Sequence, residues 1–394
     1  MTETPTSETE FVFGLLERVG HPDAVADRLR EIGDGPPDWD VILELASRHR
    51  LYSPLRRTLE SVPVNPPRSI EETLDAQYRR NSVENLRHSR QLCDIVDLFE
   101  SNDIVAIPYK GPILAEVAYG SIGDRSFGDL DLLVAADDVH AAAKLLERHG
   151  YERTNFPDIP VETLVDGTVF RWGKEFRFVD RDGGLPVELR FGFIGGRRSD
   201  ESIFADLWDR RTPNDLAGRT VWALSPEDRA LLLLVHGTKH GWRQLSWVYD
   251  VALVLASERT IDWEAVVTRA RQYHWLNAVL YGIAVVTELT GLSVPDPIRS
   301  DLDSSRLCSV GARRTVAMLR ADPMADLTFL EPITTATFLN DNLWGSVTDA
   351  VNEVLAPRKA DYEWLPLPPR FHRLYYLTRR CHLCVSTIKR FARR

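Results

Sequence analysis

Two aspartates separated by a single residue, Asp129 and Asp131, lie at the start of a short apolar run. In a β-strand, residues i and i+2 point to the same face, so the two carboxylates project together. Leu130, Leu132 and Val134 then face the opposite way, into a core. Two carboxylates on one strand face repel each other unless a cation lies between them. Closely paired oxygen ligands suit a hard cation such as Mg²⁺, which binds one or two carboxylates plus substrate phosphates.

A third carboxylate, Glu188, lies in a later strand pattern. The segment FRFVDRDGGLPVELRF predicts two strands, 176–180 and 186–191, joined by the hairpin signal Asp182-Gly183-Gly184. Alternation places Glu188 and Arg190 on the face opposite the apolar residues. Three mid-strand carboxylates suit two Mg²⁺ ions about 3.5 to 4 Å apart, the arrangement used for phosphoryl or nucleotidyl transfer. The structural alternative is that one aspartate makes a turn contact and the other carboxylates are solvated.

Basic residues precede the aspartates. The β-rich run IVAIPY ends in Lys110-Gly111-Pro112, and this break opens the helical segment ILAEVAY with proline in its first turn. Arg125 precedes Asp129 by four residues in a glycine-flanked loop, where it can reach either a phosphate or a carboxylate. A phosphate-binding role and a structural ion pair are therefore both open for Arg125.

A histidine pair, His236 and His240, has the spacing HGTKH, which places both rings on one helix face. A zinc peptidase would need HExxH, and here Gly237 replaces the glutamate that supplies the base. The expected role is packing and polar contact with nearby side chains; a place in the cleft on the substrate side is the alternative. The expected partners are Trp242, Trp247 and Asp250.

The carboxyl-terminal end carries one CxxC motif, Cys381-His382-Leu383-Cys384. A structural zinc site needs four ligands, and no second cysteine pair exists, so we expect incidental thiols. The final run IKRFARR, residues 388–394, is basic. A solvated tail is expected, with an anionic partner or a membrane surface as the alternative.

Composition restricts the class of protein. The chain has 394 residues, 44% hydrophobic and 27% charged, as expected for a globular protein with two or three packed units. A net charge of −10 argues against nonspecific nucleic-acid binding but leaves room for a local basic cleft. The acidic start MTETPTSETE is not a signal peptide, and no apolar run approaches the roughly 18 to 20 residues of a membrane span. A cytoplasmic enzyme or regulator is expected.

Three regions must position these residues. Helical spacing with proline interruptions predicts an N-terminal helical region over 1–79, in which Asp38 caps a helix and a long helix runs over 69–101. The β-rich segments predict a mixed sheet within a core over 80–222, where Asp137-Asp138 caps a helix. Four apolar-periodic segments after the helix start Ser225-Pro226 predict a C-terminal helical domain over 223–394 with a basic tail.

The segment YKGPILAEVAYGSIGDRSFGDLDLLV resembles the nucleotidyltransferase superfamily of the polymerase β type. Within it, the chain is similar to a family whose members follow roughly LKG–helix–YG–xxGxRxxxDxDLLV. The similarity continues through further segments and covers most of the chain: DDVHAAAKLLERHGY, VELRFGF, SPEDRALLLLVHGTKHGWRQLSWVYDVALVL and LPLPPRFHRLYYL. The resemblance implies an α+β fold with a polymerase β-like core, a mixed sheet with flanking helices.

The resemblance also implies roles for individual residues. Asp129 and Asp131 match the metal-binding pair and Glu188 the third acidic position, while Lys110-Gly111 matches the turn that faces the triphosphate. The wider superfamily has Gly-Ser at that turn, where the serine and backbone N–H groups hold a phosphate. Here Pro112 donates no N–H, so one such contact is missing, and the charge of Lys110 is a substitute. Family members often have histidine two residues past the third acid, where this chain has Arg190.

The expected activity is transfer of a nucleoside monophosphate from an NTP such as ATP to an acceptor hydroxyl, with two Mg²⁺ ions held by Asp129, Asp131 and Glu188. Lys110, Gly111 and Arg125 are expected to bind the phosphates. A second hypothesis is a catalytically weak nucleotide- or partner-binding module of the antitoxin-like kind. A third is a metal-dependent phosphohydrolase that uses His236 and His240. The acceptor, whether a small molecule, a protein or an RNA end, is open at this point.

Overall fold

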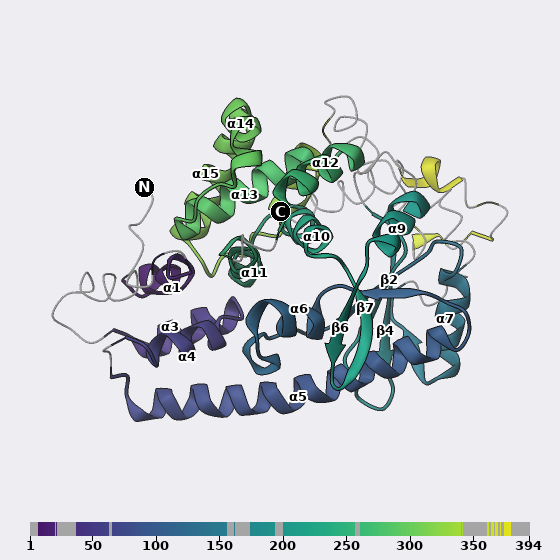
Figure 1. The fold of residues 1–394 in the computed structure, drawn as a ribbon, viewed down its shortest axis with the longest axis horizontal. Helices are drawn as coiled ribbons and strands as arrows, with labels where there is room; N and C mark the ends of the chain where they lie inside the picture. Colours follow the sequence, from purple (N-terminus) through teal and green to yellow (C-terminus); the bar gives the residue numbers. More distant parts are fainter. Residues whose placement is uncertain are drawn as a thin grey trace.

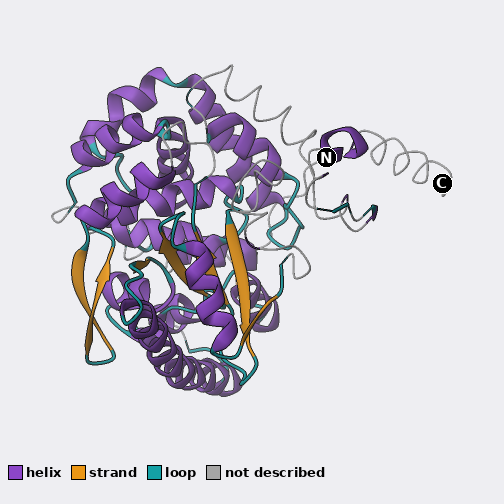
Figure 2. Cartoon of the chain, turned by 90° about the vertical axis from the view of Figure 1, so that its right-hand side faces the viewer, coloured by secondary structure: helices purple, strands orange, loops and turns teal. Residues whose placement is uncertain are grey.

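The computed structural model describes the chain except for residues 1–6, 20, 22–36, 63–64, 156–160, 162–173, 194–199, 257–260, 340, 342–360, 362–363, 366, 369–370, 372–373 and 380–394. A mixed sheet lies between a bundle of C-terminal helices and the long helix α5 (Arg68–Glu100) (Figure 1). Figure 2 shows the same layering from the side, with the strands between helices. The combination confirms the α+β class. The CxxC motif and the basic run 388–394 lie outside the described residues.

The sheet has five strands in the order β1-β2-β5-β4-β3. Strand β2 pairs parallel with β5, whereas the β1–β2, β4–β5 and β3–β4 pairs are antiparallel. The bounds are β1 (Ala106–Pro108), β2 (Leu130–Val134), β3 (Tyr151–Arg153), β4 (Glu175–Asp180) and β5 (Val187–Arg190). The two strands predicted from FRFVDRDGGLPVELRF are therefore confirmed as the β4–β5 hairpin.

The two faces of the sheet have different chemistry. Leu130, Leu132 and Val134 of β2 are buried in one core with the apolar side chains of α5 and α7 (Val139–Arg148). Leu133 belongs to the other core, which is shared with the C-terminal helices. The alternation predicted for β2 is confirmed, and Asp131, two residues before Leu133, faces the helical bundle.

The N-terminal helices are α1 (Ser7–Glu17), α3 (Trp39–Arg48) and α4 (Tyr52–Leu59), followed by α5. Asp38 caps α3 by accepting from the backbone N–H groups of Asp40 and Val41, as predicted. Helix α5 is continuous and contacts both α4 and the strand β1. The predicted boundary between residues 79 and 80 therefore falls inside a helix that joins the two regions.

A second hairpin and a helical bundle complete the described chain. Helix α9 (Asp200–Asp209) leads into β6 (Thr212–Leu216) and β7 (Arg219–Ala223). The bundle contains α10 (Pro226–Lys239), α11 (Leu245–Ala256), α12 (Trp263–Tyr273), α13 (Leu276–Thr290), α14 (Asp296–Ser304), α15 (Arg306–Ala321) and α16 (Leu330–Phe338). Ser225 caps α10 by accepting from the N–H of Asp228, as predicted. No helix of the described part is both long and apolar enough to cross a membrane.

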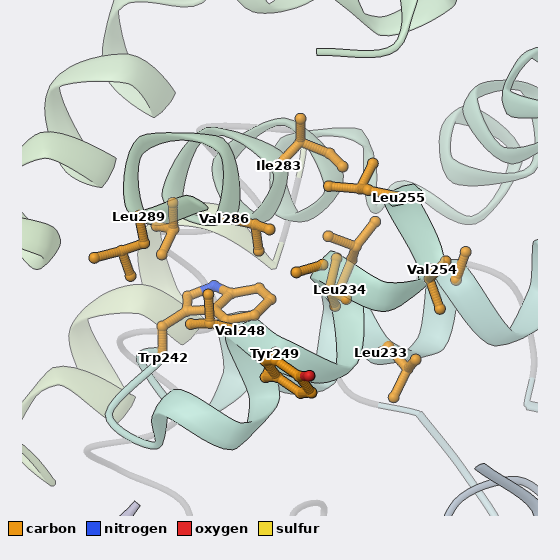
Figure 3. Close-up of a cluster of buried hydrophobic side chains, with 14 of the residues drawn as sticks. Leu233, Leu234, Trp242, Val248, Tyr249, Val254, Leu255, Ile283, Val286 and Leu289 are labelled. Carbon is orange, nitrogen blue, oxygen red and sulfur yellow. The ribbon is translucent and has the colours of Figure 1, made fainter. Parts of the chain in front are cut away.

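Close packing holds α10 against the rest of the bundle. Trp242 is fully buried among Val248, Val286 and Leu289 (Figure 3). A Cβ atom at Gly237 would lie 2.5 Å from the Trp242 ring, so this position of α10 accepts only glycine without displacing the indole. Trp242 is therefore a core residue, and α10 is fixed where it faces the sheet.

Two local predictions are wrong. Asp138 does not cap α7, because its backbone is already helical and its side chain makes no capping hydrogen bond. The segment ILAEVAY does not form one regular helix: α6 (Gly111–Leu114) passes into a π-helix over Ala115–Tyr119, which ends at Gly120 with φ 72°. The wider π turn precedes the loop that brings the chain back to β2.

A buried histidine predicts a pH-dependent stability. The His49 Nδ1 accepts from the N–H of Leu245 at 3.3 Å, and its Nε2–H donates to Pro323 O at 2.8 Å. These two hydrogen bonds suit the neutral form of the ring. Burial lowers the pKa of His49 to about 4. The unfolded chain binds a proton near its ordinary pKa of 6.5, so stability falls between about pH 6.5 and pH 4 by up to about 3 kcal/mol.

Urea unfolding of the wild type at about pH 7.5 and pH 5 measures this loss. His49→Gln is expected to remove most of the difference between the two pH values, whereas His149→Gln, at an exposed position, is expected to keep it. An unchanged difference in His49→Gln would show that other groups cause the loss.

Candidate active site

Two of the three carboxylates predicted in strands lie on one face of the sheet, whereas Asp129 lies just outside its strand. Asp131 of β2 and Glu188 of β5 are directly paired in the parallel register, and Asp129 immediately precedes β2. Asp131 is 5% exposed. The Glu188 carboxylate contacts Arg177 Nη1 at 3.3 Å and Arg190 Nη2 at 4.0 Å. The fold therefore brings together three acids that are up to 59 residues apart in the numbering.

Burial and neighbouring negative charge perturb two of these acids, Glu188 and Asp129. Burial, together with the carboxylates of Asp131, Glu175 and Asp129, raises the pKa of Glu188 to about 7. Burial and the neighbouring Asp131 likewise raise the pKa of Asp129. Like charges held this close favour a proton or another cation between them.

The donor set fits a divalent cation whose shell is completed by substrate. Among the residues that the structure describes, no three His, Cys, Asp or Glu side chains gather closely enough to hold a metal ion alone. Mg²⁺ does not require such a cage, since it is held by one or two carboxylates with waters and substrate phosphates. The all-oxygen pair Asp131 and Glu188, with Asp129 beside it, has this chemistry.

A buried lysine lies against the aspartates. Lys110, 7% exposed, places its Nζ 3.7 Å from Asp131 Oδ1 and 2.9 Å from His236 Nδ1. The Tyr109 hydroxyl donates to the same Asp131 oxygen at 3.2 Å. Burial lowers the pKa of Lys110, and the Asp131 carboxylate opposes this effect. Lys110 therefore serves as an internal counter-ion to Asp131.

The turn after β1 requires glycine. Gly111 has φ +50°, a conformation that other residues rarely adopt, and a Cβ there would lie 3.4 Å from the carbonyl oxygen of Asp129. The turn thus passes directly beside the first aspartate. Lys110 and Gly111 lie where the sequence predicted them, next to the acidic pair.

Arg125 lies behind this turn in a buried network. Its Nε and Nη2 donate to the two carboxylate oxygens of Asp250 at 2.9 Å each, and its Nη1 donates to the carbonyl of Gly111 at 3.4 Å. The Tyr119 hydroxyl donates to the same carboxylate at 2.6 Å. Burial opposes the charge on Arg125, but the Asp250 carboxylate outweighs it and raises the pKa of the guanidinium. Of the two roles open for Arg125, the structure shows the ion pair.

The histidine pair lies on the bundle side of the site. The His236 and His240 rings are 4.6 Å apart, and both contact Trp247, as expected from the sequence. His240 Nδ1 lies 3.0 Å from Glu331 Oε1, and burial lowers the pKa of His236 well below its ordinary value. Both rings are thus engaged in polar contacts, and no observation favours the phosphohydrolase hypothesis. The expected contact with Asp250 is replaced by the Arg125 pair.

Three residues of the site were missed from the sequence: Tyr109, Glu175 and Lys239. Glu175 pairs with Arg190 across the β4–β5 hairpin and also contacts Lys239 Nζ at 3.7 Å. The hairpin alternation could have identified Glu175, because it lies opposite Arg190 in the register. Lys239 follows His236 by three positions on α10 and so shares its helix face.

An open cleft with an empty volume of about 430 Å³ adjoins the carboxylates. It lies between the sheet and α10 and is lined by both polar and apolar side chains. Its lining residues are Tyr109, Leu133, Arg190, Phe193, Leu232, Val235, His236, Lys239 and Leu339.

Comparison with known proteins assigns the chain to a family. The family model described as "Uncharacterised nucleotidyltransferase" matches residues 35–291, which is more than half of the chain. The matched range includes Asp129, Asp131 and Glu188 as well as α10. The protein therefore belongs to this nucleotidyltransferase family. No match was found among curated proteins or among solved structures.

Proposed function

We propose that the protein is a metal-dependent nucleotidyltransferase with a polymerase β-type core, which transfers a nucleoside monophosphate from an NTP to an acceptor hydroxyl. The observation that carries the proposal is the carboxylate pair Asp131 and Glu188 on adjacent parallel strands, with Asp129 beside the Lys110-Gly111 turn. The family assignment supports nucleotidyl transfer as the class of activity.

Each residue has a proposed role. Asp129, Asp131 and Glu188 would hold two Mg²⁺ ions, which when bound neutralise charge on the triphosphate. The Lys110 ammonium adds positive charge on the same side, and the Gly111 backbone lets the triphosphate approach closely. Arg125 acts as a positioning residue, because it holds the carbonyl of Gly111 and anchors the turn to Asp250.

The proposed reaction is an in-line displacement. The acceptor hydroxyl oxygen attacks the α-phosphorus of the NTP, and its proton passes to Glu188 or to solvent. A new oxygen–phosphorus bond forms, while the bond from the α-phosphorus to the bridging oxygen breaks. Pyrophosphate leaves with the electron pair, and the acceptor carries the nucleoside monophosphate.

The second hypothesis, a nucleotide- or partner-binding module with weak catalysis, rests on the same turn. Pro112 provides no N–H to a phosphate, and the Lys110 ammonium is already engaged by Asp131 and His236. Both features weaken phosphate binding relative to a glycine-serine turn.

Calorimetry combined with a turnover assay separates the two hypotheses. We expect Mg²⁺-dependent binding of ATP together with release of pyrophosphate when an acceptor is present. Mg²⁺-dependent binding without any turnover across acceptor classes would instead support the binding module. Failure to bind any NTP in the presence of Mg²⁺ would contradict both.

Lys110→Met is expected to make the thermal stability of the nucleotide-free protein depend more strongly on Mg²⁺. The substitution removes the ammonium 3.7 Å from Asp131, so the carboxylates lose their internal counter-ion. Thermal unfolding with and without Mg²⁺, in the absence of nucleotide, measures the effect. The rise in Tm on adding Mg²⁺ is expected to be larger in Lys110→Met than in the wild type or in Lys144→Met, at an exposed site on α7. An equal rise in all three proteins would show that Mg²⁺ does not bind beside Lys110.

A further inference from the structure

The active-site features lie in order along one face of the strands. The Gly111 turn lies beside Asp129, before the start of β2. The Asp131–Glu188 pair follows, and the next pair on the same face is Leu133–Arg190. Successive pairs on one face are about 6.6 Å apart, because each strand residue rises about 3.3 Å. Leu133 and Arg190 line the cleft, so it extends one pair beyond the carboxylates, while Tyr109 and His236 line its end beside Asp131 and Lys110.

Resting on the proposed function, an in-line displacement together with this order determines where the acceptor hydroxyl must lie. The attacking and leaving oxygens lie on opposite sides of the α-phosphorus. With the leaving pyrophosphate at the Lys110-Gly111 turn and the α-phosphorus at the carboxylates, the attacking hydroxyl must lie on the far side. The cleft at Leu133 and Arg190 occupies that side.

The walls of the cleft indicate what it can bind. Leu133, Phe193, Leu232, Val235 and Leu339 give it an apolar lining. Two cations, Arg190 and Lys239, contact the Glu175 carboxylate, and Arg190 also lies 4.0 Å from the Glu188 carboxylate. In the described part of the chain no group accepts a hydrogen bond from the buried Arg190 Nε. A ligand with an apolar body and one anionic group complements this lining.

We propose that this cleft is the acceptor pocket and that the acceptor is a small molecule with an apolar or aromatic body, a hydroxyl group and one anionic group. An RNA end would instead need a basic groove with several stacking aromatic residues. The apolar lining of this cleft, with Arg190 and Lys239 as its cations, does not form such a groove.

A matched pair of fluorescent dyes tests the chemistry of the pocket without NTP. The probes are 8-anilino-1-naphthalenesulfonate and N-phenyl-1-naphthylamine, which differ by the sulfonate. Val235→Trp, which fills the cleft from α10, is expected to weaken binding of both dyes about tenfold or more. Val83→Trp, at an exposed position of α5, is the matched control and is expected to bind both dyes like the wild type. Lys239→Gln is expected to weaken the sulfonate dye alone.

Either of two results would overturn the pocket chemistry. The first is unchanged dye binding in Val235→Trp. The second is an equal loss of both dyes in Lys239→Gln, which would show that the cleft does not select an anionic group.

Label transfer tests the role of the pocket as acceptor site. ATP labelled at the α-phosphate is incubated with Mg²⁺ and with the small-molecule, RNA or protein fraction of a cell extract. We expect label to enter the small-molecule fraction with the wild type and Val83→Trp, and not with Val235→Trp, although Val235→Trp still binds ATP. Label in RNA or protein would overturn the acceptor class. If label entered none of the fractions, both the proposed function and the acceptor role would be contradicted. The dye experiments would still test the chemistry of the pocket separately.

Discussion

Asp131→Asn is expected to reduce nucleotidyl transfer about a thousandfold, a loss typical of removing a group that stabilises charge in the transition state. Asp131 faces Glu188 across the parallel strands and contacts both Lys110 and Tyr109. An asparagine has nearly the same shape but no negative charge, so it cannot replace a carboxylate ligand of Mg²⁺. Single-turnover rates at saturating ATP measure the effect on the chemical step.

The control is Asp137→Asn, the same exchange at an exposed residue outside the site. Asp137→Asn is expected to keep the wild-type rate, and both variants are expected to unfold cooperatively. If Asp131→Asn retained the wild-type rate, Asp131 would have no role in catalysis, and the proposed metal site would have to be abandoned.

Asp250→Ala is expected to lower the free energy of unfolding by about 3 to 5 kcal/mol, the usual cost of breaking a buried ion pair. The guanidinium of Arg125 is 8% exposed and Asp250 is 1% exposed, so the substitution leaves a buried charge without its partner. It also removes the acceptor of the Tyr119 hydroxyl. Urea unfolding at neutral pH measures the change.

The double variant Arg125→Met/Asp250→Leu separates charge from packing. Because neither charge remains, its stability is expected to recover most of the loss seen in Asp250→Ala. The turn at Gly111 would still lack its hydrogen bond from Arg125, so transfer should remain impaired. A loss of less than about 1 kcal/mol in Asp250→Ala would show that the ion pair adds little to stability.

Local pattern was sufficient to predict which face of each strand carries the acidic residues. Period-two alternation assigned Asp131 and Glu188 to the polar side of their own strands, but the parallel pairing of β2 with β5, which makes them neighbours, was not predicted. The caps at Asp38 and Ser225 were also predictable, because each depends on a side chain and a backbone N–H two or three residues away. The same local reasoning failed at Asp138, whose backbone is already helical, and over Ala115–Tyr119, which forms a π-helix.

Features that depend on residues far apart in the sequence could not be predicted. Arg125 and Asp250 are 125 residues apart, and nothing in the loop around Arg125 distinguishes a phosphate ligand from a partner on α11. Lys110 meets His236 only because α10 packs across the sheet face. The cleft is likewise assembled from β1, β2, β5 and α10 with flanking segments, so its lining cannot be derived from any one motif.

The position of the label in ATP tests most directly whether the protein transfers a nucleoside monophosphate. The protein is incubated with Mg²⁺, the small-molecule fraction and ATP labelled at either the α- or the γ-phosphate. The proposed function predicts that the α-label enters the product, that the γ-label is released as pyrophosphate, and that both events require Mg²⁺ and disappear in Asp129→Asn/Asp131→Asn. Transfer of the γ-label to the acceptor, or undiminished α-label transfer by the double variant, would contradict it.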